Sequence, residues 1–146
     1  MERTALFAGT FAPYTRGHHA IVQRALAMFD KVVVAIGNNS DKNMMLTPEQ
    51  RKAFIESVYA DEPRVQVAIY DGLTVDYARS IGATALLRGV RSVKDFEYER
   101  DLADINMRVG GVETVILISS PENAVISSSV VRELLSYGKD VSEFLP

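Results

Sequence analysis

Three short segments of the sequence carry residue types that bind phosphate groups. The first is Gly9–His18, in which a glycine, threonines and a histidine run into the start of an expected helix. The second holds Arg88 and Arg91, whose guanidinium groups clamp phosphate oxygens well, and the third is Ser127–Ser129, at the start of another expected helix. Free backbone N–H groups and the helix dipole favour anions at such starts. The set therefore predicts a site that holds and positions a polyphosphate.

Each segment also has an ordinary structural explanation. His18 could simply begin a helix after a surface turn, and arginines are most often solvated. Helix capping needs only one serine, so three in a row exceed that need. Lys42 is a lone loop lysine that gains interest from its place after the second expected strand, and His19 is expected to be a solvated first-turn residue.

A further candidate surface lies on one helix. One face of the helix expected over Asp95–Arg108 carries Glu99, Leu102, Ala103 and Asn106. Such a face either packs in the core with a polar fringe or walls a pocket.

The signatures of several enzyme classes are missing from the sequence. It contains no cysteine, no Walker loop, no G-x-G-x-x-G fingerprint and no serine-hydrolase pairing of nucleophile and base. No histidine or carboxylate cluster has metal-ligand spacing, so no metal held by the protein is expected. A site made of phosphate donors without a nucleophile favours direct in-line transfer, in which positioning and charge stabilisation provide the catalysis.

Composition points to an ordinary globular protein with a local anion site. The 146 residues suit one domain over 1–146, and 47% hydrophobic with 24% charged residues is a typical balance. A net charge of −3 argues against a general nucleic-acid binder. No apolar run approaches the ~20 residues of a membrane span, and Met1–Thr4 leaves no room for a signal peptide before the first strand. We therefore expect a cytoplasmic protein without a membrane partner.

The elements that must position these residues alternate along the chain. Apolar runs predict strands over Thr4–Ala8, Val32–Ile36, Val65–Ile69, Ala85–Leu87 and Thr114–Ile118. Helical periodicity and capping signals predict helices over His18–Phe29, Thr47–Tyr59, Thr74–Ile81, Asp95–Arg108 and Ser127–Tyr137, with one more turn at Val141–Leu145. This alternation predicts an α/β fold, a doubly wound five-stranded parallel sheet, for which we expect the order 3-2-1-4-5. Ligands of such sheets bind beyond the carboxyl ends of the strands at the switch in strand order, between the first and fourth strands.

Two motifs resemble those of a known superfamily. Gly9-Thr10-Phe11 with Pro13 and Thr15-x-Gly17-His18 resembles the G-T-F-D-P…T-x-G-H signature of the nucleotidylyltransferases, which have a Rossmann-like fold. Ile126-Ser127-Ser128-Ser129-x-x-Arg132 resembles their I-S-S-S-x-x-R motif. Leu87–Arg91 with Asp95–Glu99 is similar to the phosphopantetheine adenylyltransferase family in particular, and the likeness runs over the whole chain.

The resemblance implies a role for each motif residue. Thr10, His18, Lys42 and Arg91 would be the catalytic group, with His18 stabilising the transition state at the α-phosphate. ATP would be bound by Gly9, Thr10, Phe11, His18, Gly89, Val90, Arg91, Glu99, Ala124, Val125, Ile126, Ser127, Ser128, Ser129 and Val130. The acceptor would be bound by Thr10, Lys42, Thr74, Arg88, Leu102 and Asn106, with Lys42 and Arg88 on its phosphate.

The family's chemistry is implied with these residues. AMP would pass from ATP to 4′-phosphopantetheine, giving dephospho-coenzyme A and pyrophosphate, with coenzyme A as a candidate feedback ligand. Mg²⁺ would be held mainly by phosphates and water. The resemblance also implies a homohexamer.

The sequence departs from the family at one position, and it leaves two alternative functions open. Ala12 stands where the family has aspartate, and Arg16 adds a cation beside it. A nucleotidylyltransferase of the same fold acting on nicotinamide mononucleotide or a cytidylyl acceptor is the nearest alternative. A nucleotide-binding regulatory protein that does not catalyse is the other, and Ala12 is the residue that favours it.

Overall fold

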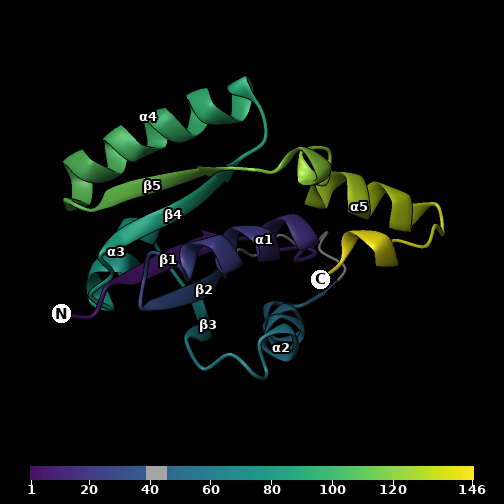
Figure 1. Ribbon diagram of the computed structural model, residues 1–146, viewed down its shortest axis with the longest axis horizontal. Coiled ribbons are helices and arrows are strands. Elements are labelled where there is room, and N and C mark those ends of the chain that lie inside the picture. Colours follow the sequence, from purple (N-terminus) through teal and green to yellow (C-terminus); the bar gives the residue numbers. More distant parts are fainter. Residues whose placement is uncertain (39–45) are drawn as a thin grey trace.

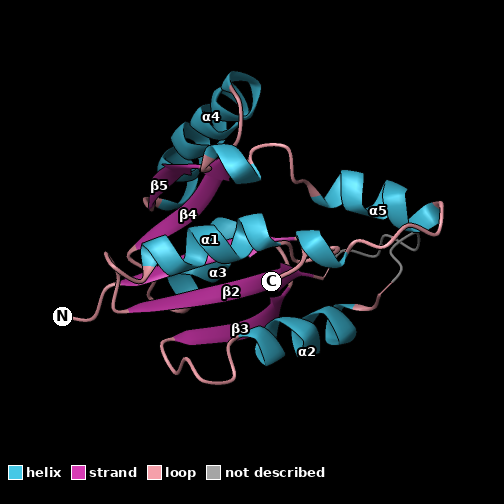
Figure 2. Cartoon of the chain, turned by 45° about the vertical axis from the view of Figure 1, so that its right-hand side comes forward, coloured by secondary structure: helices cyan, strands magenta, loops and turns pink. Residues whose placement is uncertain are grey.

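The protein folds as one open parallel sheet with helices on both faces (Figures 1 and 2). The computed structural model describes residues 1–38 and 46–146. Its strands are β1 (Thr4–Gly9), β2 (Lys31–Gly37), β3 (Val65–Tyr70), β4 (Ala85–Val90) and β5 (Glu113–Ile118). Its helices are α1 (Arg16–Ala25), α2 (Pro48–Val58), α3 (Thr74–Ser80), α4 (Val93–Gly110) and α5 (Ser128–Ser136), with short 3-10 turns η1 (Pro121–Asn123) and η2 (Ser142–Phe144).

The predicted sheet is confirmed. Its strands run parallel in the order β3-β2-β1-β4-β5, so the order reverses between β1 and β4. Neighbouring strands β1 and β2 carry near-continuous apolar runs because a parallel sheet covered by helices is buried on both faces.

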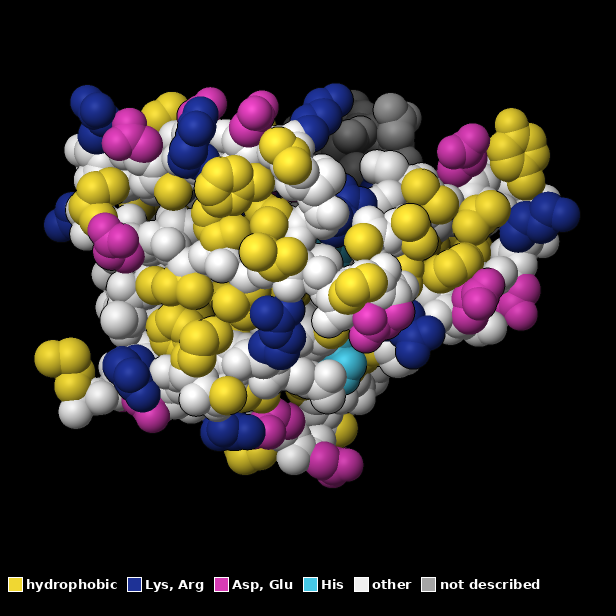
Figure 3. All heavy atoms as spheres, turned by 45° about the horizontal axis from the view of Figure 1, so that its top comes forward, with side chains coloured by type: hydrophobic (Ala, Val, Ile, Leu, Met, Phe, Trp, Pro, Cys, Tyr) yellow, Lys and Arg dark blue, Asp and Glu magenta, His cyan; other side chains and the backbone are white. Residues whose placement is uncertain are grey.

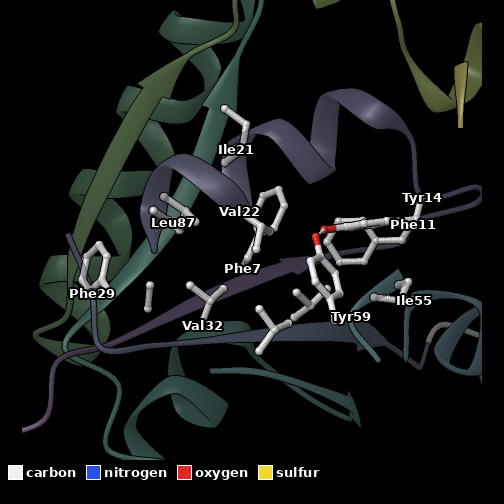
Figure 4. Close-up of a cluster of buried hydrophobic side chains, with 14 of the residues drawn as sticks. Phe7, Phe11, Tyr14, Ile21, Val22, Phe29, Val32, Ile55, Tyr59 and Leu87 are labelled. Atoms are coloured by element: carbon white, nitrogen blue, oxygen red, sulfur yellow. Dashed lines mark hydrogen bonds between the residues drawn. The ribbon is translucent and has the colours of Figure 1, made fainter. Parts of the chain in front are cut away.

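Alternate residues of the central strands feed two separate cores. Ala5 and Phe7 belong to the cluster on the face covered by α1 and α2, together with Val22 and Ile55. Figure 4 shows Phe7, Val22 and Ile55 in this cluster. Leu6 and its alternates pack on the opposite face with residues of α3. The sheet is therefore held between two hydrophobic layers, and its carboxyl edge stays open for a site.

Several element boundaries follow local signals in the sequence. Thr47 caps α2 through a capping box with Gln50, as expected, and Pro48 occupies the first turn. Gly82 lies past the end of α3 with φ +68°, the left-handed conformation that favours glycine.

Two elements, α1 and β4, end three or more residues away from the prediction, while the other boundaries agree within two residues. Helix α1 begins at Arg16 and ends at Ala25, while the expected helix ran from His18 to Phe29. Strand β4 continues to Val90, although the apolar run predicted an end at Leu87. Its continuation pairs with β5, so tertiary pairing outweighs the local preference.

Candidate active site

A cleft of about 320 Å³ opens at the carboxyl ends of β1 and β4, where the strand order reverses. All three phosphate-binding segments expected from the sequence meet in it. Of the residues predicted to bind ATP, the cleft is lined by Gly9, Thr10, Phe11, His18, Gly89, Arg91, Glu99, Ile126, Ser127, Ser128 and Ser129. Val90, Ala124, Val125 and Val130 lie beside this lining without forming part of it. Lys42 lies outside the described residues.

A second cavity of about 290 Å³ adjoins the first. Thr74, Leu102 and Asn106 line it, and most of the remaining wall is apolar. Arg88 and Glu99 line both cavities, so they form the shared wall. The face of α4 noted in the sequence is thus a pocket wall.

His18 is held in a defined tautomer by the start of α1. Thr15 caps the helix, accepting from the backbone N–H of His18 through Oγ1 (3.4 Å). The backbone N–H of Thr15 donates to His18 Nδ1 (2.9 Å), so Nδ1 is the acceptor nitrogen and Nε2 carries the proton. Burial, with smaller contributions from the positive charges of Arg88 and Arg91, lowers the pKa of His18 to about 4. His18 is therefore a neutral hydrogen-bond donor in the cleft.

Aromatic rings fix the plane of the His18 imidazole. Tyr14 stacks on it with ring centroids 5.3 Å apart and an interplanar angle of 19°. Phe11 meets it edge-on at 5.0 Å and 87°. Packing on two sides leaves the imidazole little freedom to turn away from the cleft.

The neighbouring histidine differs from its prediction. His19 is half-buried rather than solvated, and its Nδ1 lies 3.0 Å from the hydroxyl of Tyr59. The Tyr59 hydroxyl in turn contacts that of Tyr14 (Figure 4), and the Tyr14 ring stacks on His18. Burial raises the pKa of both tyrosines well above the usual value, so both stay neutral. Sequence reasoning missed this series of side-chain contacts because Tyr59 lies 40 residues from His19.

Arg88 and Glu99 form a bidentate ion pair. Arg88 Nε and Nη2 donate to the two carboxylate oxygens over 2.7 and 2.8 Å, and Nη1 donates to the carbonyl of Ala8 over 2.7 Å. Glu99 is 5% exposed. Burial acts to lower the pKa of Arg88, but the hydrogen bonds and charge of Glu99 outweigh it, so the net shift is upward. The two residues were expected on different ligands, and the structure brings them into direct contact.

Arg91 stands at the far end of β4, just before α4. Its Nε and its backbone N–H both contact Asp95 Oδ2 over 3.0 Å. Ser92 caps α4 by accepting from the N–H of Asp95. Gly89, two residues earlier, permits a close approach to α1, since a Cβ there would lie 3.1 Å from a side-chain carbon of Ile21.

The serine turn combines capping with tethering of the first loop. Ser127 caps α5 by accepting from Val130 N–H (3.2 Å), and Ser128 Oγ donates to the carbonyl of Pro13 (2.8 Å). Ser129 Oγ accepts from Arg132 (3.2 Å). These hydroxyls are engaged within the protein, whereas the first N–H groups of α5 have no partner inside the helix. The backbone is therefore the better source of anion donors at this turn.

Two arginines differ from what the sequence analysis indicated. Arg51 was not singled out there, and Arg16 does not lie where it was expected. Arg51, on α2, is 3% exposed and donates to the carbonyl of Thr10 over 2.5 Å. The sequence carries a signal for the burial of Arg51, because this residue shares a helical face with Ile55 and Tyr59 at i, i+4 and i+8, and both are buried. Arg16, expected beside the phosphates, instead donates to the carbonyl of Glu143 (2.8 Å).

The described residues offer no ready metal cage. Residues 1–38 and 46–146 contain no group of three or more histidine, cysteine, aspartate or glutamate side chains placed to hold a metal ion. The cleft carboxylates Asp95 and Glu99 are engaged by Arg91 and Arg88. None of the helices described is long and apolar enough to span a membrane.

The family described as cytidylyltransferase-like matches residues 6–134. A Porphyromonas gingivalis protein named phosphopantetheine adenylyltransferase is 55% identical over 145 residues, covering 99% of this chain and 95% of its own. A Bacteroides fragilis protein of the same name is 50% identical over 144 residues, covering 99% and 96%.

A solved structure shows the same fold at low identity. It is a bifunctional NMN adenylyltransferase/ADP ribose pyrophosphatase from Francisella tularensis, complexed with AMP and a manganese ion. The TM-score is 0.74 at 16% identity, over 99% of this chain and 44% of that one. This likeness supports the Rossmann-like nucleotidylyltransferase fold alone.

Proposed function

The chain belongs to the cytidylyltransferase-like family and, within it, to the phosphopantetheine adenylyltransferases, and from this premise we propose that it transfers AMP from ATP to 4′-phosphopantetheine. The products are dephospho-coenzyme A and pyrophosphate. The observation that carries the proposal is the neutral Nε2–H of His18, which shares one cleft with Arg88, Arg91 and the start of α5.

The transfer proceeds in one step. An oxygen of the acceptor phosphate attacks the α-phosphorus of ATP, forming a new phosphorus–oxygen bond as the bond to the β-phosphate bridge oxygen breaks. Pyrophosphate leaves with the electron pair, so the step needs no covalent enzyme intermediate. His18 donates to an α-phosphate oxygen as negative charge builds there, and Thr10 offers a second donor. A neutral donor suits this role because it exchanges no proton during the step.

Charge on the leaving group is balanced by a second set of residues. Arg91 and the N–H groups of the Ser127–Ser129 turn hold the β- and γ-phosphates at a helix start. A magnesium ion, when bound, would neutralise phosphate charge, and the phosphates and water would hold it, since the cleft carboxylates are already paired with arginines.

The acceptor occupies the second cavity and the shared wall. Its phosphate lies against Arg88, with Lys42 as the second cation. The pantetheine arm follows the mostly apolar wall that includes Thr74, Leu102 and Asn106. Coenzyme A carries the same arm together with an adenylyl group, and we propose it as a feedback ligand of the same two cavities.

Assembly into a homohexamer is part of the proposal. Large hydrophobic side chains on α4 are exposed, among them Val93, Tyr98, Ile105 and Val109. Hydrophobic side chains gather in patches over the side where α4 and β5 lie (Figure 3). Patches of this kind mark association surfaces. Light scattering that gives the mass of a single chain at micromolar concentration would contradict this assembly.

A panel of acceptors tests the proposed specificity. Pyrophosphate release from ATP is measured with phosphopantetheine, with nicotinamide mononucleotide and with a cytidylyl acceptor given CTP. We expect release with phosphopantetheine alone. Release only with the mononucleotide would assign the chain to the alternative reaction, and no release with any acceptor would favour a regulatory protein.

A further inference from the structure

Arg51 is a buried cation outside the motifs that carry the resemblance. It extends from α2, is 3% exposed, and donates through Nη1 to the carbonyl oxygen of Thr10. Within residues 1–38 and 46–146, no carboxylate lies within ion-pair distance of it. Burying a guanidinium is costly, and among the described residues Arg51 Nε has no hydrogen-bond partner, so the Thr10 contact is made at the expense of stability. Such a contact points to a role in the site.

The residue after Thr10 has an unusual backbone. Phe11 has φ 51°, in the left-handed region that non-glycine residues rarely adopt. Strained residues of this kind persist only where their surroundings hold them, and they concentrate at functional sites. Arg51 holds the carbonyl on one side of Phe11, and Arg132 holds the carbonyl of Ala12 on the other over 2.7 Å.

The contact with Arg51 also sets the direction of a donor. In a planar trans peptide the C=O and N–H bonds point in opposite directions. Because the Thr10 carbonyl points to Arg51, the N–H of Phe11 points away from α2. Across the part of the chain that is described, this N–H donates to no other group. Thr10 and Phe11 both line the cleft.

We propose that Arg51 is a positioning residue for the transfer reaction, which fixes the Thr10–Phe11 peptide so that the Phe11 N–H and the Thr10 hydroxyl face the phosphate. The inference rests on the proposed function. Arg51 does not touch the reacting atoms; it acts through Thr10. Small misplacements of such donors are costly in reactions that depend on positioning.

Arg51→Met tests this role, with Arg79→Met as the matched control. Methionine keeps much of the side-chain length and removes the donor and the charge. Arg79 also donates to a backbone carbonyl, that of Gly110 over 3.2 Å, but it lies on α3 and lines neither cavity. Steady-state kcat and KM, thermal unfolding midpoints and the ATP-induced rise of those midpoints are measured for both variants and for Arg51→Lys.

We expect Arg51→Met to lower kcat by about tenfold or more, with a smaller change in KM for phosphopantetheine and a smaller ATP-induced rise. Arg51→Lys recovers part of kcat because it can donate one hydrogen bond. Arg79→Met keeps kcat within about twofold of the wild type. Folded Arg51→Met with wild-type kcat overturns the inference, as does an equal loss of kcat in Arg79→Met.

Two outcomes need a second readout. If Arg51→Met does not fold, Arg51→Lys decides: a lower kcat at an unchanged midpoint supports the inference, and an unchanged kcat overturns it. If the wild type releases no pyrophosphate with phosphopantetheine, the proposed function fails. The ATP-induced rise then tests Arg51 alone, and an equal rise in Arg51→Met and wild type overturns its positioning role.

Discussion

The backbone N–H of Thr15 donates to Nδ1 of His18 over 2.9 Å, and this contact leaves Nε2 as the protonated nitrogen of the ring. The T-x-G-H motif therefore does two things at once. Its threonine caps α1, and the same residue orients the donor of its histidine. The motif's spacing follows from this pairing across one helical turn.

Replacing His18 should damage turnover far more than nucleotide binding. We expect His18→Ala to lower kcat by about 10²–10³, because a donor used mainly in the transition state contributes a few kcal/mol. The ATP dissociation constant should change much less. His19→Ala is the matched control, since His19 contacts Tyr59 rather than the cleft, and it should stay within about threefold of wild-type kcat. Near-normal turnover of His18→Ala would reduce His18 to a capping residue.

The lowered pKa of His18 predicts a pH-dependent stability. The folded-state pKa is about 4 and the ordinary value is 6.5, so the folded protein binds fewer protons between them. The contribution of His18 is therefore fully present above pH 6.5 and is lost as the pH falls toward about 4. His19, whose pKa burial also lowers, acts in the same direction.

Urea unfolding at pH 7.5 and pH 5 measures this contribution. The free energy of unfolding should fall more steeply toward pH 5 in wild type than in His18→Gln, which keeps only the His19 contribution. Across pH 6 to 8, kcat should show no titration of His18. Identical pH dependence of stability in the two proteins would show that His18 is not held neutral by the fold.

Lys42 and Arg88 should determine the preference for a phosphorylated acceptor. We expect wild type to use phosphopantetheine far better than pantetheine, measured as a ratio of kcat/KM values. Arg88→Ala and Lys42→Ala should each lower that ratio by about tenfold or more, because a lost charge-assisted contact weakens only the phosphorylated acceptor. Arg88→Ala leaves Glu99 without its partner, which could unfold a fraction of the protein. Unfolded protein lowers the kcat/KM values for both acceptors by the same factor, so their ratio is unaffected. An unchanged ratio in both variants would place the acceptor phosphate elsewhere.

Ala12 should make this enzyme slower than its Ala12→Asp variant. Ala12 lines the cleft, and its carbonyl accepts from Arg132, so the loop stays held without the family's aspartate. We expect Ala12 to affect turnover more than folding, because an aspartate could orient a water on Mg²⁺ and alanine cannot. Arg16 cannot compensate from its contact with Glu143. Steady-state rates over a Mg²⁺ titration test this, and identical curves for the two proteins would make the departure neutral.

Local signals predicted most of the fold. The alternation of elements indicates a parallel sheet, although it also fits strand orders other than the observed β3-β2-β1-β4-β5. The strands of the central sheet, the Thr47 capping box and the Gly82 stop follow from neighbouring residues. The end of β4 did not, because its last residues are strand-forming only when paired with β5. The limit of local reasoning was therefore set by partners distant in the sequence.

The same limit applies to the site. Motif residues at helix starts were found because capping and anion binding have short-range signatures. The pairing of Arg88 with Glu99, the Tyr59 contact of His19 and the burial of Arg51 depend on how separate helices pack against the sheet edge. Residue type alone indicated a solvated side chain for His19, whereas in the structure the side chain is half-buried and contacts Tyr59.

The central claim is AMP transfer to the acceptor phosphate in one step, and the mass of the products formed from ATP and 4′-phosphopantetheine tests it most directly. We expect dephospho-coenzyme A and pyrophosphate in equal amounts, no pyrophosphate without acceptor, and protein of unchanged mass throughout. A product other than dephospho-coenzyme A, or adenylylated protein that goes on to modify the acceptor, would contradict it.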